Sequence, residues 1–208
     1  MRREGFNDNH KRIYRIYRQS GLQIQKRARK GKLRRLKLVL PLVNRPNERW
    51  SMDFVHARFA DGRVFRCFNL VDDFTHECLL ILTAKSIRSK NLIEALNLLK
   101  ISRGLPKEIV CDNGPEFISQ IMDIWAYQNQ LSLKFIQPGQ PTQNAFIESF
   151  KGKFRNECLN QNWFLNLNEA QKTIEEWRLD YNQYRPRRSL KMQTPNEFAK
   201  QFQSMLLN

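Results

Sequence analysis

The sequence has little cysteine, no long apolar run and no start typical of a secreted protein. Its 4 cysteines and 3 histidines occur at spacings that match neither a zinc site nor a disulfide framework. The longest unbroken apolar run, Cys78 to Leu82, has five residues, whereas a membrane-spanning helix needs roughly 20. No apolar stretch follows the charges at the N-terminus, so no secretory signal is expected. We therefore expect a reduced, cytoplasmic protein with no membrane partner.

Acidic charge is also scarce. Lys and Arg number 36 against 20 Asp and Glu, which gives a net charge of +16. Residues 1–40 hold 14 of the basic residues and 2 of the acidic ones, a net of +12, so the other 168 residues carry only +4. A basic arm joined to a nearly neutral globular part indicates a polyanionic partner, most simply nucleic acid. A solvated tail that aids solubility is the alternative.

The basic arm divides into two predicted segments. Residues 1–25 are interpreted as part of a helix-turn-helix-like DNA-binding segment, in which Asp8 can cap a helix that ends at Gly21. One side of this helix presents a row of basic residues: Arg12, Arg15 and Arg18. An amphipathic packing helix with a charged exterior explains the pattern equally well. Residues 26–46 are interpreted as a linker whose like charges keep it extended until it meets an anion. Its predicted phosphate contacts are Lys26, Arg27, Arg29, Lys30, Arg34 and Arg35.

Hydrophobic periodicity beyond the arm predicts a mixed α/β domain, and 41% apolar residues suffice for its core. Three short segments rich in β-branched and aromatic residues indicate an antiparallel meander, with strands at 50–58, 63–71 and 77–83. These are followed by a helix at 86–103, a strand at 108–112, a helix at 116–130 and a strand at 131–136. The alternation adds a parallel pair to the meander. The residues expected in the core include Trp50, Trp125 and Trp177.

Three further helices are predicted after an irregular loop at 137–144. Asn144 can cap the first of them, and Asn168 is the expected cap of the second. The stretch from Thr194 to Glu197 has the pattern of a capping box and begins the third.

Three carboxylates lie on the predicted elements of this domain. Asp53 lies within the first strand, Asp112 ends a short strand, and Glu148 falls in the first turns of a helix. If their oxygens converge, they can hold two magnesium ions that activate a water or hydroxyl and stabilise a leaving oxygen in phosphodiester chemistry. Other acids have comparable claims, namely Asp72, Asp73, Glu116 and Glu157. Composition does not choose among them, and each acid taken singly also suits a turn, a cap or the surface.

The spacing of the acids resembles that of a known enzyme family. Asp112 and Glu148 are separated by 35 residues, and Arg155 follows Glu148 by seven. Five blocks occur in the family's order: RPNERWSMDFV, NLVDDFTHECL, RGLPKEIVCDNGPEF, FIQPGQPTQNAFIESFKGKFRNECLN and WRLDYNQYRPRRSLKMQTPNEF. With Asp53 upstream, they resemble retroviral integrases and, more closely, bacterial insertion-sequence transposases that encode this core in a second reading frame. The resemblance covers about residues 45–198.

The resemblance implies a ribonuclease-H-like fold, which is an α/β fold with a five-stranded mixed sheet flanked by helices. Residues 47–160 would form the integrase catalytic core, and residues 161–208 would form C-terminal helices that complete it. The matched catalytic metal ligands are Asp53, Asp112 and Glu148. They would hold two Mg²⁺ ions, for which Mn²⁺ can substitute. Gly114, in the turn after the second aspartate, is expected to permit close backbone approach.

The family's DNA contacts are expected around the glutamate. Arg155 matches the basic residue two turns beyond it, and Lys151 lies on the same helical side. The opposite side, which should pack inward, presents Phe146, Phe150 and Phe154. An exposed ion-pair face is the alternative for Lys151 and Arg155. Gln143 and Asn144 are further expected DNA contacts, although Asn144 suits a helix cap equally well.

The implied activity is DNA strand cleavage and strand transfer that moves an insertion sequence. The implied partners are DNA (the element ends and the target), further copies of the chain in a homo-oligomer, and an upstream-frame helix-turn-helix protein or fusion partner. The implied location is the bacterial cytoplasm, in association with the nucleoid.

The sequence also differs from the family's usual residues at several positions. Four places differ, at Gln140, Lys151, Arg187-Arg188 and Lys191. These departures bear on DNA-end specificity more than on chemistry, since the acids are all in place. The chain also opens almost inside the family's helix-turn-helix, so a truncated, catalytically silent DNA-binding remnant is the alternative. A stand-alone nuclease of the same fold is disfavoured because the matching blocks extend well past the acids.

Overall fold

The computed structural model describes residues 8–22, 42–137 and 144–202. The chain divides into two compact units, Met1–Leu36 and Lys37–Asn208, and each is described by itself.

The described part of the first unit contains one helix, α1 (His10–Gln19). Its cap is Asn9, whose side-chain oxygen accepts a hydrogen bond from the Lys11 amide at 3.0 Å. The prediction that Asp8 caps this helix is therefore wrong, because the helix begins one residue later than expected. Asp8 instead lies one turn from Arg12 and forms an exposed ion pair with it at 3.6 Å.

The second unit is built on a five-stranded sheet with the order β3-β2-β1-β4-β5. Its strands are β1 (Arg49–Arg58), β2 (Val64–Asp72), β3 (Cys78–Ala84), β4 (Glu108–Cys111) and β5 (Ser132–Phe135). The first three strands pair antiparallel, whereas β4 pairs parallel with both β1 and β5. The predicted mixed sheet, with a parallel pair added to a meander, is confirmed.

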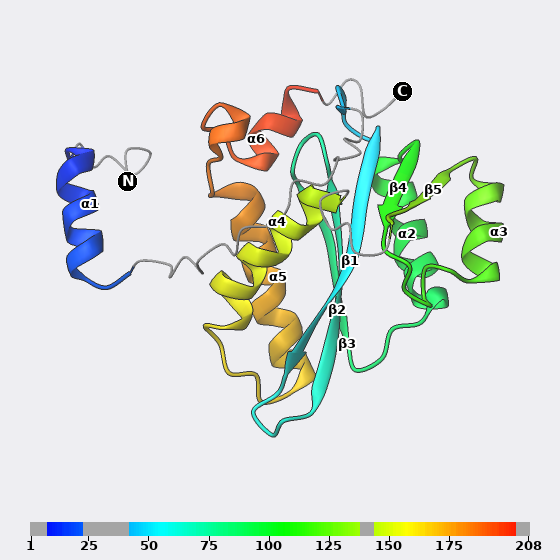
Figure 1. Cartoon of the computed structure of the whole chain (residues 1–208), viewed down its shortest axis with the longest axis horizontal. Coiled ribbons are helices and arrows are strands. Elements are labelled where there is room, and N and C mark those ends of the chain that lie inside the picture. Colours follow the sequence, from blue (N-terminus) through cyan, green and yellow to red (C-terminus); the bar gives the residue numbers. More distant parts are fainter. Residues whose placement is uncertain (1–7, 23–41, 138–143, 203–208) are drawn as a thin grey trace. The chain divides into compact units, whose positions relative to one another are not determined.

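Helices cover both faces of the sheet (Figure 1). One face carries α2 (Ser89–Arg103) and α3 (Gln120–Gln128), and the other carries α4 (Ala145–Phe154) and α5 (Leu167–Gln183). A π-helical turn (Arg155–Leu159) follows α4, and a 3-10 turn (Arg188–Leu190) precedes α6 (Pro195–Lys200). No helix in these described stretches of the chain is long and apolar enough to cross a membrane.

Strand β1 distributes its side chains between the two faces. Because successive side chains of a strand point to opposite faces, Trp50 and Met52 pack into the core beneath α2 and α3, whereas Val55 packs beneath α4 and α5. Asp53 has the same parity as Val55 and therefore points toward α4. The alternation of this one strand thus directs a carboxylate at the helix that carries Glu148.

The packing of α4 matches its predicted inward side at Phe150 and Phe154, whereas Phe146 is only half-buried. Phe150 and Phe154 are buried, and their rings lie 5.7 and 5.0 Å from the ring of Trp177 in α5. Helix α5 is capped by Asn166, which accepts a hydrogen bond from the Glu169 amide, so the prediction of Asn168 is wrong by two residues. The predicted capping box at the start of α6 is confirmed.

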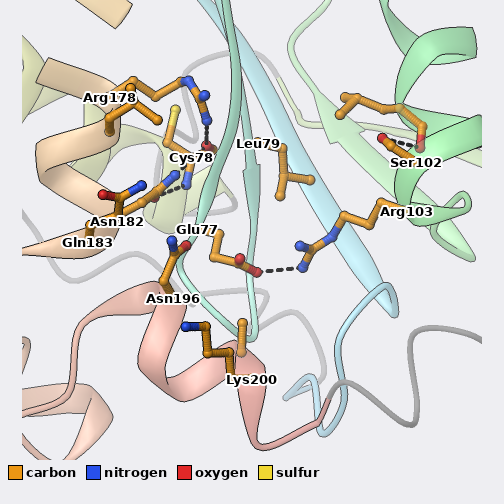
Figure 2. A pocket seen from close by; sticks show the side chains of 13 residues that line it. Glu77, Cys78, Leu79, Ser102, Arg103, Arg178, Asn182, Gln183, Asn196 and Lys200 are labelled. Carbon is orange, nitrogen blue, oxygen red and sulfur yellow. Dashed lines mark hydrogen bonds and ion pairs between the residues drawn. The ribbon is translucent and has the colours of Figure 1, made fainter. Parts of the chain in front are cut away.

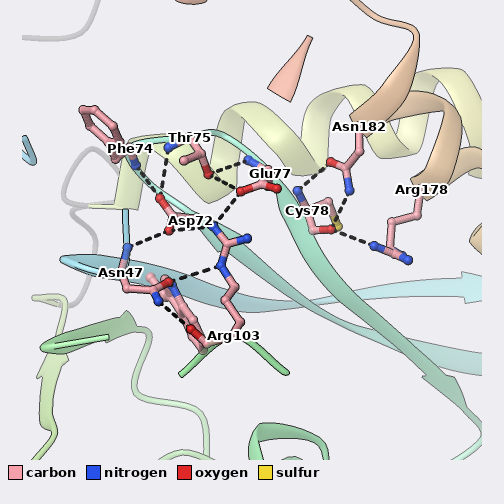
Figure 3. A network of polar contacts seen from close by, with 10 residues as sticks. Asn47, Asp72, Phe74, Thr75, Glu77, Cys78, Arg103, Arg178 and Asn182 are labelled. Carbon is pink, nitrogen blue, oxygen red and sulfur yellow. Dashed lines mark hydrogen bonds and ion pairs between the residues drawn. The ribbon is translucent and has the colours of Figure 1, made fainter. Parts of the chain in front are cut away.

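A buried polar network holds the β2–β3 turn against the rest of the sheet (Figure 3). The Asp72 carboxylate accepts hydrogen bonds from the Phe74 and Thr75 amides, at 2.9 and 3.0 Å, which shapes the turn. Arg103, the last residue of α2, donates to Glu77 at 2.6 Å and reaches Asp72 at 3.4 Å. The expected turn role of Asp72 is confirmed, but its burial and its arginine partner had no signal in the sequence.

Candidate active site

A lysine ammonium group connects two of the three predicted carboxylates. Lys151 Nζ lies 2.6 Å from Asp53 Oδ2 and 3.0 Å from Glu148 Oε1. Glu148 and Lys151 are one turn apart on α4, so their contact is local, whereas the contact with Asp53 joins α4 to β1. The structure therefore brings Asp53 and Glu148 to one place, at which a cation lies between them.

Asp53 is the most buried of the three acids, with its side chain 11% exposed. Burial raises the pKa of its carboxyl group, the ion pair with Lys151 opposes that rise, and the negative charge of Asp112 adds to it. The repulsion between Asp53 and Asp112 indicates that the second aspartate lies within electrostatic reach of the first. A cation between these acids relieves that repulsion.

Asp112 is held by the turn that follows β4. The Gly114 amide donates to Asp112 Oδ1 at 2.9 Å, and the Asn113 side chain donates to the Ile136 carbonyl at 2.9 Å, just beyond β5. A Cβ atom at position 114 would lie 3.0 Å from Asp112 Oδ1 and 3.3 Å from the ring of Phe117. The expected close approach at Gly114 is therefore confirmed, because the glycine leaves room for the carboxylate.

The three carboxylates do not form a ready-made metal site. Within residues 8–22, 42–137 and 144–202, no group of three or more His, Cys, Asp or Glu side chains is arranged to hold a metal ion. Nevertheless, the donor set suits a hard divalent cation, because it consists of carboxylate oxygens. The ammonium group between Asp53 and Glu148 shows that the site already attracts positive charge.

The three predicted catalytic acids differ from the four other candidate acids in their ionic partners. Each rival carboxylate is joined to an arginine: Asp72 to Arg103, Asp73 to Arg49, Glu116 to Arg66, and Glu157 to Arg185. An acid neutralised by an arginine serves the fold, since removing either partner would leave a charge without its counterion. Asp53 and Glu148 share one lysine instead, and Asp112 accepts a backbone hydrogen bond. Sequence patterns could not reveal this distinction, because the arginines are 24 to 50 residues away in the first three pairs.

The structure describes only some of the residues that we predicted to contact DNA. Arg155 is exposed at the first residue of the π-helical turn, and Arg12 and Arg15 are exposed on α1. Asn144 is the first residue before α4, but its side chain makes no capping hydrogen bond, so the expected side-chain cap is wrong. The remaining predicted contacts lie outside the described residues, namely Gln143, Lys26, Arg27, Arg29, Lys30, Arg34 and Arg35.

A cavity of about 510 Å³ lies elsewhere, between β3, α2, α5 and α6. Glu77 and Arg103 point toward each other along its wall, and Arg178 and Lys200 contribute further charges (Figure 2). None of the three predicted catalytic acids lines it. No sequence motif indicated this cavity, because it is formed by residues from separate elements.

Comparison with known proteins identifies the family. The chain matches the integrase core domain over residues 43–141 and again over residues 129–195. It is 46% identical over 199 residues to a 31.7 kDa protein of insertion element IS407 from Burkholderia multivorans, covering 96% of this chain and 72% of the relative. It is 41% identical over 202 residues to a 39.2 kDa protein of insertion element IS476 from Xanthomonas euvesicatoria, covering 96% and 58%.

The fold has a solved counterpart. The catalytic core of HTLV-2 integrase, determined with magnesium in a trimeric form, superposes with a TM-score of 0.60 at 20% identity, covering 74% of this chain and 97% of that core. This likeness shows the ribonuclease-H-like architecture, in which a five-stranded mixed sheet lies between helices. The relatives, the matched family and the fold agree, and the chain accordingly belongs to the integrase core domain family as a DDE-type transposase of an insertion element.

Proposed function

We propose that Asp53, Asp112 and Glu148 hold two Mg²⁺ ions, with Mn²⁺ as a substitute, for DNA cleavage and strand transfer at the ends of an insertion sequence. The observation that carries this assignment is the position of Lys151 Nζ, 2.6 Å from Asp53 and 3.0 Å from Glu148, beside the charge of Asp112. When bound, the ions would activate a water or a DNA hydroxyl and stabilise the leaving oxygen.

The surrounding residues of the chain have separate tasks in this proposal. Lys151 favours the ionised form of Asp53, which burial disfavours and which metal binding requires. Lys151 and Arg155 lie on one side of α4 and contact the phosphates of the DNA that enters the site. Gln143 contacts DNA just before α4, whereas the Asn144 side chain, only 2% exposed, must leave its buried position to reach DNA. The basic residues of the arm, among them Arg12, Arg15 and the six linker cations, neutralise phosphates farther along the duplex.

The proposal extends to the assembly in which the reaction occurs. Two element ends and a target must be held together, so we assign the chain to a homo-oligomer on DNA. The trimeric form of the HTLV-2 integrase core shows that a related fold self-associates. An upstream-frame helix-turn-helix protein, or a fusion with it, supplies further DNA contacts, and the complex acts at the bacterial nucleoid.

Replacement of Asp112 by Asn tests the catalytic assignment. The two side chains have nearly the same shape, but Asn lacks the charge that a metal ligand needs. We expect Asp112→Asn to abolish nicking and strand joining on branched DNA with Mg²⁺ or Mn²⁺, and to leave DNA binding nearly unchanged. Asp123→Asn, which makes the same change at an exposed position of α3, should retain full activity.

Two outcomes would contradict parts of this assignment. If the unmodified protein and Asp112→Asn both bind DNA and neither cuts it, even with an upstream-frame protein added, the chain is a catalytically silent DNA-binding remnant. If Asp112→Asn loses binding and cleavage equally, Asp112 has a structural role rather than a catalytic one.

A further inference from the structure

A second group of basic residues lies on another side of α4, away from Glu148. Phe146 and Lys153 are seven residues apart and therefore share this side. The ring of Phe146 packs 5.3 Å from the ring of His76, in the β2–β3 turn. His76 Nδ1 lies 3.4 Å from Ser189 Oγ, in the 3-10 turn that follows α5.

Arg187 completes this group from the segment between α5 and the 3-10 turn. Its guanidinium lies over the ring of Tyr181, 4.1 Å from the ring centre, and Tyr181 in turn packs 5.1 Å from Phe150 of α4. A chain of contacts thus gathers four polar side chains from three separate segments. These four residues, His76, Lys153, Arg187 and Ser189, are called the basic cluster below.

The backbone fixes two members of the basic cluster in place. His76 adopts a left-handed conformation with φ of 58°, and its amide donates to the Asp72 carbonyl at 2.8 Å. Arg187 forms an isolated β-bridge with Gln193, with a hydrogen bond of 2.8 Å from the Arg187 amide. The backbone at both residues is therefore fixed before any ligand arrives, and the contact with Tyr181 also places the Arg187 guanidinium, which lowers the entropic cost of binding.

The basic cluster has more positive charge than its surroundings neutralise. Among residues 8–22, 42–137 and 144–202, no carboxylate forms an ion pair with Lys153 or Arg187, whereas the neighbouring Arg185 is paired with both Asp180 and Glu157. Arg187 Nε is buried and has no hydrogen-bond partner among these residues. Glu157, which is paired with Arg185, is near enough to act on Lys153 electrostatically but forms no ion pair with it. Lys153 and Arg187 therefore still repel each other, and an anionic ligand would reduce that repulsion.

The electrostatic effects on nearby groups agree with this description. Burial, together with the charge of Arg187, lowers the pKa of Lys153, although the charge of Glu157 acts in the opposite direction. Burial and the charges of Arg187 and Lys153 lower the pKa of His76 to about 4, although Asp72 acts in the opposite direction. His76 is therefore neutral at pH 7, and an anion bound beside it would raise the pKa of its imidazole.

We propose that the basic cluster binds a phosphate group, and that in this protein the phosphate belongs to the DNA backbone. A guanidinium fork, an ammonium group, a hydroxyl and an imidazole are the donors that recognise phosphate oxygens. Because Lys153 lies on a different side of α4 from Lys151, this contact is separate from those near the catalytic acids. The identification of the phosphate as DNA rests on the proposed function, whereas the binding of phosphate does not.

The pKa of His76, measured by NMR titration with and without inorganic phosphate, tests the site directly. Phosphate should raise this pKa from about 4 toward or above the ordinary value of 6.5, while chloride at equal ionic strength should not. Lys153→Gln and Arg187→Gln should each remove most of the phosphate-dependent rise. Lys172→Gln, an equal loss of charge at an exposed position of α5, should leave it intact.

Two variants are needed because Arg187→Gln also loses the contact with Tyr181, and Lys153→Gln does not. A His76 pKa that phosphate leaves unchanged in the unmodified, folded protein would overturn the site. A short DNA duplex should move the His76 pKa in the same direction as inorganic phosphate. If phosphate moves it and the duplex does not, the assignment to DNA is wrong, whatever Asp112→Asn shows in the cleavage assay.

Discussion

In the proposed metal site, Lys151 would compete with the metal ion for the acids. Its ammonium group lies between Asp53 and Glu148. Solvent screens its contact with the buried Asp53 weakly, and its contact with Glu148, whose side chain is 42% exposed, more strongly. A divalent cation that takes oxygens from both acids must displace this ammonium group. The same lysine therefore keeps Asp53 ionised and competes with the metal.

Lys151→Gln should consequently increase the affinity for Mg²⁺. Breaking a partly buried ion pair costs on the order of 1 kcal/mol, so its removal should strengthen binding about fivefold. Isothermal titration calorimetry with Mg²⁺ in the absence of DNA measures this directly. Lys153→Gln removes the same charge from another side of the same helix and should change the affinity little. Equal or weaker Mg²⁺ binding by Lys151→Gln would show that the lysine and the metal do not compete.

For single residues, the sequence identified the candidate catalytic acids but not the residues that form ion pairs with the acids of the fold. Asp53, Asp112 and Glu148 stood out through spacing and resemblance, and none of them is paired with an arginine of the part of the chain that the structure describes. The ion pair of Glu116 with Arg66 joins residues 50 positions apart, and the contact of Lys151 with Asp53 spans 98. Such pairs arise only when strands and helices pack, so no local pattern contains them.

At the scale of elements, periodicity predicted which segments form but not where each one starts. The helix expected at 116–130 is α3, Gln120–Gln128, because a turn from Gly114 to Ile118 occupies its first predicted residues. Caps were misplaced for a related reason. Asn, Asp and Ser suit caps and turns alike, so neighbouring candidates such as Asn166 and Asn168 cannot be separated without the backbone.

Gly114, in the turn after β4, and Gly152, in α4, offer a paired test of how that turn places Asp112. In Gly114→Ala, the new Cβ would lie 3.0 Å from Asp112 Oδ1 and 3.3 Å from the buried Phe117 ring, so the turn must shift. We expect a loss of about 1 kcal/mol in stability and a larger loss of cleavage, because the carboxylate moves. Gly152→Ala has no atom within 4 Å of its new Cβ and lies in α4, so it should stabilise the protein by about 0.5–1 kcal/mol.

Urea unfolding of both variants, combined with the cleavage assay, measures these opposite effects. If Gly114→Ala retains full activity and stability, the turn has enough freedom to accept a side chain, and the role of Gly114 in placing Asp112 is refuted. Full activity of Gly152→Ala is required for the comparison, since that position touches none of the acids.

At the scale of the whole molecule, positive charge is concentrated in the first unit. Residues 1–36 hold 13 Lys and Arg against 2 acidic residues, while the sheet, its helices and all three acids belong to the second unit. Phosphate neutralisation releases counterions, so the logarithm of DNA affinity falls with the logarithm of salt concentration by about 0.9 for each phosphate contacted. The two units can therefore be distinguished by their contributions to this slope.

Deletion of residues 1–36 should leave the second unit folded and make DNA binding much less dependent on salt. A matched full-length variant replaces six of the nine linker cations with Gln, at Lys26, Arg27, Arg29, Lys30, Arg34 and Arg35. If each contacts one phosphate, the slope of this variant should be smaller by about 5. Fluorescence anisotropy of a labelled duplex across a series of NaCl concentrations measures both slopes. An unchanged slope in both proteins would mean that the arm is a solvated tail and that the second unit alone, including the basic cluster, neutralises the DNA.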